Sequence, residues 1–415
     1  MTYQEALEWI HSKLTFGIKP GLERMDWMLE QLGHPERNLA AVHIVGTNGK
    51  GSTTSYLQHI FSLAGYEVGT FTSPYILDFR ERISVNGEMM AKTDFLQAVE
   101  RIKPVVERMP LESDMEPATE FEVITLLMFE YFGHIHPVDI AFIEAGMGGL
   151  YDSTNVFKAL AVICPSIGLD HQAVLGETHE AIARQKVGVL DQKVPLIYAN
   201  SRVDVERVFQ AKARETDSPT YCLGRDFSIE ISGDSFTYRK GACEISAIHL
   251  KLLGTHQMAN ASLAITASLL LEKEYPRVTK DIIKKGLEST HWAGRTELMR
   301  QNLMIDGAHN QESIAALVAV MKDYTEKPIK ILVAAINTKP AAAMLEQLEE
   351  LGQVSVTTFD YPRALTLQDY PDKYTKIVSW QEWVNEAKSP DVFYLITGSL
   401  YFISQIRQYI TKELA

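Results

Sequence analysis

The segment GTNGKGST, residues 46–53, places three glycines, one lysine and a Ser-Thr pair in a single turn. Glycine lets the backbone curl where a side chain would clash, and N–H groups at the start of a following helix then face outward and attract an anion. Lys50 adds a positive charge, and a hydroxyl of the Ser-Thr pair can bind phosphate or phosphate-bound Mg²⁺. The segment therefore predicts a phosphate-binding loop rather than a tight turn that binds nothing. It is a variant of the pattern G-x-x-x-x-G-K-[ST], because Gly51 follows Lys50 and Ile44 replaces the first glycine.

Further polar side chains each come at the end of an apolar, strand-like segment: Ser73, Glu144, Asp170 and His171. Ligands of open parallel sheets gather at the carboxyl ends of the strands, so these groups could share Mg²⁺ beside a triphosphate. Glu144 is the strongest candidate, because a carboxylate that closes a wholly apolar strand has little structural reason to be there. Ser73, before a proline, is more typical of a turn, and His171 is equally typical of a hydrogen-bonded loop residue.

Three weaker candidates lie farther along the chain. Lys186 falls on a predicted helix, where a lysine is most often solvated. Asp306 ends a strand-like segment, and His309 lies just before the helix that follows. The Gly398-Ser399 pair repeats the strand–glycine–serine–helix arrangement, which suits an anion site or simple helix capping.

Alternating strands and helices must position these side chains, and this alternation predicts an α/β fold. We expect a mostly parallel sheet with a phosphate-binding loop in an N-terminal domain, residues 1–295, and a smaller Rossmann-like α/β domain, residues 296–415. The segment HWAGRTE, residues 291–297, is the predicted linker. Residues 219–253 alternate with period two and predict a small antiparallel sheet. The expected strands are 40–45, 67–72, 138–144, 159–167, 194–199, 302–306, 329–336, 354–359 and 392–398; the expected helices are 3–13, 22–32, 52–64, 93–108, 120–132, 179–189, 258–275, 311–323, 340–350, 380–387 and 399–411.

Composition narrows the class of protein. A chain of 415 residues is too long for one ordinary core, which favours two domains. The formal net charge of −13 and the lack of a basic stripe argue against nucleic acid as a partner. The cysteines Cys164, Cys222 and Cys243 have no metal-site or disulfide spacing, and no apolar run is long enough to span a bilayer. We therefore expect a cytoplasmic protein with no membrane partner, and nothing requires more than a monomer.

The chain resembles the folylpolyglutamate synthases, within the wider group of ATP-dependent Mur-type amide ligases. The segments that carry this resemblance occur in order along nearly the whole length: GTNGKGS, FTSPYILDFRERI, ATEFEVIT, EAGMGGLYDSTN, SIGLDHQ, IARQK, LLGTHQMANA, WAGRTE, DGAHN and ITGSLYF. The resemblance implies an enzyme that adds L-glutamate to the γ-carboxylate of tetrahydrofolate and its polyglutamates through an acyl phosphate, releasing ADP and phosphate. Its implied ligands are ATP, folate, L-glutamate and Mg²⁺, with two magnesium ions expected and a monovalent cation allowed.

The same resemblance implies roles for individual residues. Lys186 is expected to be carbamylated near the metals, which overturns its interpretation as a solvated lysine. Catalytic roles fall on Lys50, Lys186 and His309, the last at the site of phosphoryl transfer and amino-acid binding. The implied ATP contacts are Asn48, Gly49, Lys50, Gly51, Ser52, Thr53, Asn260, Arg295 and Asp306. The implied metal ligands are Ser73, Glu144 and His171, and the implied substrate contacts are Arg24, Thr119, Glu122, Tyr151, Asp152 and Ser153.

Three departures from the family pattern leave the substrate open. Tyr75 replaces a histidine, Leu150 replaces an arginine, and Gln311 replaces the proline that often follows DGAHN. The first two fall on the folate side, so a dihydrofolate synthase or a bifunctional enzyme is an alternative. A second class, suggested by the loop alone, is a nucleotide switch that joins no small molecules.

Overall fold

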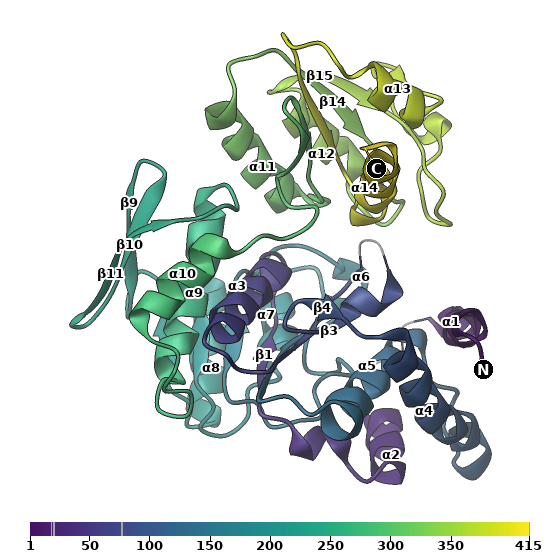
Figure 1. Cartoon of the computed structure of the whole chain (residues 1–415), viewed down its shortest axis with the longest axis vertical. Coiled ribbons are helices and arrows are strands. Elements are labelled where there is room, and N and C mark those ends of the chain that lie inside the picture. Colours follow the sequence, from purple (N-terminus) through teal and green to yellow (C-terminus); the bar gives the residue numbers. More distant parts are fainter. Residues whose placement is uncertain (18, 20, 76–77, 415) are drawn as a thin grey trace. The chain divides into compact units, whose positions relative to one another are not determined.

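The computed structural model describes residues 1–17, 19, 21–75 and 78–414, and it divides into two compact units. The first unit is formed by Met1–Tyr75, Arg80–Leu250 and Met258–Thr290, and the second by Ile76–Phe79, Lys251–Gln257 and His291–Ala415. The two units are described separately below, and Figure 1 shows the elements of each.

The first unit is built on an eight-stranded sheet in the order β4-β3-β2-β5-β1-β6-β7-β8. All neighbouring pairs are parallel except β2–β3 and β3–β4, which are antiparallel at one edge. The central strands are mostly apolar and are buried at every position, as expected for a parallel sheet covered on both faces. The strands are β1 (Ala41–Ile44), β2 (Val68–Phe71), β3 (Ile83–Val85), β4 (Glu88–Met89), β5 (Ile140–Glu144), β6 (Val162–Cys164), β7 (Leu196–Tyr198) and β8 (Thr220–Cys222).

Helices of this unit cover the sheet, and several begin at capping residues that the sequence makes visible. Thr119 caps α5 in a capping box with Glu122, and Thr178 caps α7. Helix α10 packs so closely on α3 that a side chain at Gly286 would clash with the backbone of Ile60. The helices are α1 (Tyr3–His11), α2 (Glu23–Gln31), α3 (Lys50–Leu63), α4 (Lys92–Glu112), α5 (Glu120–Glu130), α6 (Gln172–Leu175), α7 (His179–Val187), α8 (Val203–Glu215), α9 (Thr255–Leu270) and α10 (Lys280–Ser289).

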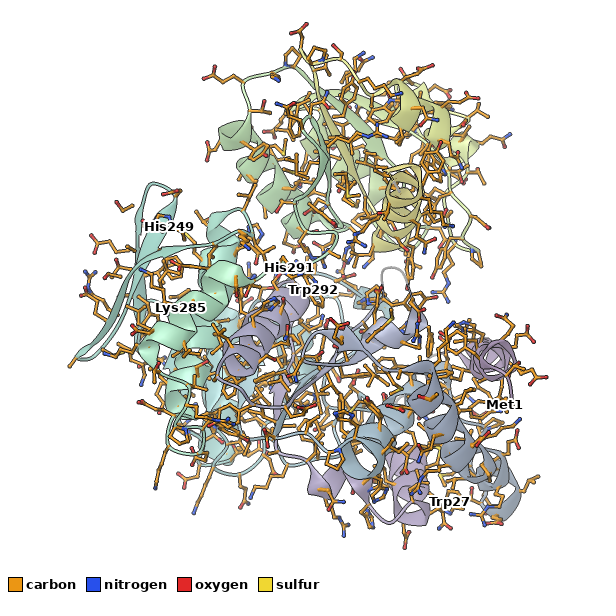
Figure 2. The ribbon with its side chains drawn as sticks, in the orientation of Figure 1. Met1, Trp27, His249, Lys285, His291 and Trp292 are labelled. Atoms are coloured by element: carbon orange, nitrogen blue, oxygen red, sulfur yellow. The ribbon has the colours of Figure 1, made fainter. Side chains whose placement is uncertain are left out.

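A small antiparallel sheet, β9 (Ser228–Ser232), β10 (Ser235–Lys240) and β11 (Cys243–His249), lies beside α10 (Figure 1). Figure 2 labels His249 at the end of this sheet and Lys285 on the helix. The backbone N–H of His249 donates to Glu288 Oε1 at 3.4 Å, and Lys284 Nζ donates to the Ser246 carbonyl at 3.0 Å. These hydrogen bonds join the small sheet to the helix.

The second unit is a six-stranded sheet in the order β12-β13-β17-β14-β15-β16, parallel except for β12. One apolar cluster packs α11 and α12 against the sheet, and another packs α13 and α14 against it. This is the architecture of a Rossmann-like α/β layer. Its elements are β12 (Glu297–Arg300), β13 (Leu303–Ile305), β14 (Ile329–Val333), β15 (Gly352–Val356), β16 (Thr375–Lys376), β17 (Phe393–Thr397), α11 (Gln311–Tyr324), α12 (Ala341–Leu348), α13 (Trp380–Glu386) and α14 (Leu400–Leu414).

The predicted fold class is confirmed, with local differences. The helix expected from residue 52 begins at Lys50, because Gly49 adopts a left-handed conformation and turns the chain into the helix there. The period-two segment from residue 219 does not all join the small sheet, since β8 extends the large parallel sheet instead. Helices α6, α8 and α10 and the short strands β3, β4, β12 and β16 were not expected. In the part of the chain that the structure describes, none of the helices combines the length and apolarity that crossing a bilayer requires.

Candidate active site

The turn between β1 and α3 has the geometry of an anion cradle. Gly46 and Gly49 have φ of 139° and 87°, values that side-chain-bearing residues rarely adopt. A Cβ at Gly49 would also lie 2.5 Å from Asn260 Oδ1, so only glycine allows this approach. No side chain caps the N-terminus of α3, which begins at Lys50. The helix therefore directs its first backbone amides and its positive dipole end at the turn.

Two lysines converge on one carbonyl of this turn. Lys50 Nζ donates to the Gly46 carbonyl at 3.0 Å, and Lys186 Nζ donates to the same oxygen at 2.8 Å. Lys50 Nζ also lies 3.6 Å from Glu144 Oε1, at the end of β5. A cation, a carboxylate and the cradle of the turn thus meet at the carboxyl end of the sheet.

Lys186 is buried, so the interpretation of this residue as a solvated helix lysine is wrong. The residue is only 4% exposed, and the loop before Leu150 packs on the last turn of α7, where the Leu150 N–H donates to the Gln185 carbonyl at 2.7 Å. A Cβ at Gly149 would lie 2.5 Å from the Lys186 carbonyl, so a glycine is needed there. Burial, followed by repulsion from the Lys50 ammonium, lowers the pKa of Lys186 to about 7, against weaker attraction from Asp170 and Asp152. This amine is therefore unprotonated to a much larger extent near neutral pH than an ordinary lysine.

The strand order places the other predicted polar residues along one edge of the sheet. Strands β2, β5, β1 and β6 are consecutive neighbours in the sheet. Glu144 is the last residue of β5, and Ser73, the phosphate-binding turn and His171 follow β2, β1 and β6, respectively. The Glu144 carboxylate is buried, whereas the His171 side chain is 47% exposed and its Nε2 lies 3.9 Å from Asp170 Oδ2.

The donor set at this edge suits magnesium. Within the described residues, no three side chains of His, Cys, Asp or Glu gather into a preformed metal site. Mg²⁺ is commonly held by one or two carboxylates together with phosphate oxygens and water, so a ready-made protein cage is not needed. Glu144, beside the turn, and the Ser73 hydroxyl, after β2, are oxygen ligands of the right kind.

The turn is also tied to the loop that follows β6, through residues that the sequence did not single out. Thr47 and Ser166 each use one hydroxyl to bind the backbone of the opposite segment. The backbone N–H and carbonyl of Asn48 are both bound by Ser166 Oγ at 2.9 Å, so that amide already has a partner within the protein. The hydroxyl of Thr53 is buried and has no hydrogen-bond partner among the residues that the structure describes.

The predicted substrate residues form two internally bonded groups. In the first, Arg24 Nε donates to Glu122 Oε1 at 2.9 Å, and an Arg24 Nη donates to the Lys19 carbonyl. The other oxygen of Glu122 accepts from the backbone N–H of Thr119 at 2.7 Å. Both side chains of this ion pair are buried. The pair joins the start of α2 to the start of α5.

In the second group, Asp152 holds the loop that follows β5. Its carboxylate accepts from the backbone N–H of Met147 and from both the N–H and the hydroxyl of Thr154. Burial raises the pKa of Asp152, and these hydrogen bonds oppose that rise. Ser153 shares a hydrogen bond with Thr125, and the Tyr151 side chain is exposed. Tyr151 is thus the member of this group that a ligand can reach without rearrangement.

The predicted residues of the second unit gather at the carboxyl ends of β13 and β17. Asp306 is buried, and its carboxylate accepts from the backbone N–H groups of Thr296 and Ala308, each at 2.8 Å. The His309 Nδ1 donates to the Gly307 carbonyl at 2.8 Å, which fixes the ring against its own turn. Any side chain at Gly307 would meet the Arg295 guanidinium at 2.5 Å. Arg295, Asp306 and His309 therefore surround one turn of this unit.

A glycine-rich turn at the head of a parallel sheet, with a lysine and a buried carboxylate beside it, defines a nucleotide-binding α/β protein. The family model for the Mur ligase middle domain matches residues 44–268, the part of the chain that holds this turn. The chain is 38% identical to a dihydrofolate synthase/folylpolyglutamate synthase of Bacillus subtilis, over 98% of each protein. It is 34% identical to a folylpolyglutamate synthase of Lacticaseibacillus casei, again over 98% of each.

Solved structures agree with these relatives. The apo form of L. casei FPGS matches with a TM-score of 0.88 and 32% identity, over 99% of this chain and 100% of that one. A structure described as an FPGS–AMPPCP–folate complex matches with a TM-score of 0.86 and 32% identity, over 98% and 99% of the two chains. The chain belongs to the folylpolyglutamate synthase/dihydrofolate synthase family of Mur ligases.

Proposed function

We propose that this protein is an ATP-dependent ligase that adds L-glutamate to the γ-carboxylate of folate and of its polyglutamates. One observation carries the proposal: the anion cradle at Lys50 belongs to a chain that is similar over its full length to enzymes named for this reaction. The structure described as a complex with AMPPCP and folate supports ATP and folate as substrates. We propose further that the enzyme works as a cytoplasmic monomer without nucleic-acid or membrane partners.

The reaction proceeds in two steps. A γ-carboxylate oxygen of folate attacks the γ-phosphorus of ATP, the bond to ADP breaks, and an acyl phosphate forms. The amine of L-glutamate then attacks the acyl carbon, phosphate leaves with the bonding electrons, and the amine releases a proton. Catalysis of this kind depends on positioning and on neutralising charge, so no covalent enzyme nucleophile is needed.

Residues of the first unit provide for the nucleotide. The backbone amides at the start of α3 and the Lys50 ammonium hold the phosphates. The ammonium has three donors, so its bond to the Gly46 carbonyl leaves donors for a phosphate oxygen. Ser73, Glu144 and His171 are the proposed holders of Mg²⁺, which when bound neutralises phosphate charge. The other proposed ATP contacts of this unit lie on or beside the same turn: Asn48, Gly49, Gly51, Ser52, Thr53 and Asn260. The backbone N–H of Asn48 is already bound by Ser166 Oγ.

We assign a modified form to Lys186. An unprotonated amine attacks the carbon of CO₂ and loses a proton, which gives a carbamate with carboxylate-like oxygens. Its burial and its pKa of about 7 support this assignment, since an ordinary lysine is almost wholly protonated at neutral pH.

The remaining candidates have supporting roles in the proposal. The Arg24–Glu122 pair, Thr119, Tyr151, Asp152 and Ser153 form the folate side, with the carboxylates holding the loops and Tyr151 exposed to the ligand. In the second unit, Arg295 and Asp306 act on ATP, and His309 acts at the site of phosphoryl transfer and amino-acid binding.

A second activity, dihydrofolate synthesis, is favoured by a specific observation: the B. subtilis relative carries both names. The substitutions Tyr75 and Leu150 on the folate side concern this choice. Both activities use the same nucleotide chemistry and differ in the acceptor acid.

One experiment tests both. Purified protein is incubated with ATP, Mg²⁺ and L-glutamate, together with either tetrahydrofolate or dihydropteroate, and the products are weighed by mass spectrometry. A product heavier than the acceptor by one glutamyl residue, with equimolar phosphate release, is expected with tetrahydrofolate. ATP hydrolysis that is independent of an acceptor, with no amide formed, would indicate a nucleotide switch and refute the ligase.

A further inference from the structure

The phosphate-binding turn and the loop after β6 are joined by a reciprocal pair of hydroxyl side chains. Thr47 Oγ1 donates to the Gly168 carbonyl at 3.1 Å and accepts from the Gly168 N–H at 2.9 Å. Ser166 Oγ donates to the Asn48 carbonyl at 2.9 Å and accepts from the Asn48 N–H at 2.9 Å. The Thr47 N–H also donates to the Ser166 carbonyl at 2.9 Å. We call these five hydrogen bonds the hydroxyl clamp.

The position of the clamp explains why hydroxyl side chains are used. Parallel pairing of β1 with β6 ends where the Val45 N–H donates to the Ile163 carbonyl. Beyond this point the turn curls away, and the two backbones can no longer bond each other in a ladder. One hydroxyl can donate once and accept twice, so it satisfies both polar groups of one residue on the opposite segment. Valine or alanine can do neither.

The loop after β6 also forms the floor of the turn. A Cβ at Gly46 would lie 3.2 Å from Pro165 Cδ, and one at Gly49 would lie 2.9 Å from Pro165 Cβ. The same loop continues directly into Asp170 and His171, the segment proposed to lie at the metal. A shift of this loop would therefore move the turn and the metal segment relative to each other.

We propose that Thr47 and Ser166 are positioning residues that fix the distance between the phosphate-binding turn and the Asp170–His171 segment. Their hydroxyls act through the backbone groups of the opposite segment. This inference rests on the proposed function, because it assumes that Mg²⁺ and nucleotide phosphates bind at these two segments. Its consequence is that the clamp governs how strongly Mg²⁺ enhances nucleotide binding.

The test compares Thr47→Val and Ser166→Ala with Thr47→Ser, which keeps the hydroxyl. Ser218→Ala is the matched control. Ser218 Oγ also joins two loops, because it donates to the Asp191 carbonyl at 3.1 Å. These loops precede β8 and β7, so they lie at the amino ends of the strands, away from the phosphate-binding turn. Calorimetry measures the affinity for AMPPCP with and without Mg²⁺. Losing the two side-chain hydrogen bonds of one hydroxyl is expected to cut the Mg²⁺-dependent gain in affinity by about five- to thirtyfold. Thr47→Ser should recover most of it, and Ser218→Ala should match wild type.

A second measurement does not depend on the loaded enzyme. Hydrogen exchange of the nucleotide-free protein should show the Gly168 amide losing protection in Thr47→Val and the Asn48 amide losing protection in Ser166→Ala. Thermal unfolding confirms that each variant folds.

Three outcomes separate the ideas. The proposal is overturned if Mg²⁺ enhances AMPPCP affinity in both variants as much as in wild type. It is also overturned if a variant loses the same affinity for AMPPCP with and without Mg²⁺, because the clamp would then affect only the turn. Wild-type protein that fails to bind AMPPCP at all contradicts the proposed function itself and is recognised without any variant.

Discussion

The most demanding prediction concerns the amine of Lys186. In the folded protein burial lowers its pKa from the ordinary lysine value of 10.5 to about 7. At pH 7 about half of this amine is the free base, compared with roughly 0.03% of an ordinary lysine, a difference of about a thousandfold. The free base is the form that captures CO₂, so carbamate at Lys186 is expected to form with a pH midpoint near 7.

The assay adds ¹³C-labelled bicarbonate to nucleotide-free protein and follows the carbamate signal by NMR in a series of buffers between pH 6 and 10. The Lys186→Met variant identifies the signal, because it keeps a similar buried volume without the amine. A Lys186-dependent signal that is negligible at pH 8 and still rising at pH 10, as the ordinary lysine pKa of 10.5 would give, would refute the burial argument; the absence of any such signal would refute the carbamate.

The same shift has a consequence for stability. Between pH 7 and 10.5 the unfolded chain holds more protons at this position than the folded one, so the free energy of unfolding contributed by Lys186 rises with pH across that window. Below pH 7 both states are protonated and the full cost of the buried charge is present. Denaturant unfolding of wild type should show this rise relative to Lys186→Met, and parallel pH profiles of the two proteins would contradict it.

Three further predictions concern the turn and the folate side. Gly49→Ala is expected to weaken AMPPCP binding at least tenfold, by calorimetry, because its Cβ would strike Asn260 Oδ1 in a left-handed backbone; unchanged affinity would mean that the turn relaxes freely. Lys50→Ala should abolish ATP-dependent product formation while leaving the circular dichroism spectrum unchanged, and residual turnover near wild type would remove this lysine from the mechanism. Arg24→Met should lower the free energy of unfolding by roughly 3–5 kcal/mol in urea titrations, because it leaves the Glu122 carboxylate buried without its cation; a loss below about 1 kcal/mol would show that water reaches the carboxylate.

Local sequence patterns were sufficient for the fold class and for one edge of the site. Short apolar segments before Ser73, Glu144 and His171 predicted strands that end in polar groups, and the strand order places these ends side by side. The turn at Lys50 was recognisable because glycine, lysine and hydroxyl residues have local conformational reasons to occur together. The prediction missed elements that are stabilised mainly by pairing with adjacent strands rather than by their own sequence pattern, among them the short edge strands β3 and β4.

The sequence by itself therefore determined the local structures that depend on residues adjacent along the chain: a strand, a tight turn and the start of a helix. Tertiary structure alone decided the environments that depend on distant segments. Lys186 looks like a surface lysine along its own helix, yet it is buried against the Gly46 carbonyl, 140 positions away. Thr47 and Ser166 look like ordinary loop residues until the pairing of β1 with β6 brings them together. The packing of distant segments decides which groups are buried, and burial in turn shifts a pKa or lets a backbone amide find its partner. The spacing of residues along the chain does not encode this packing.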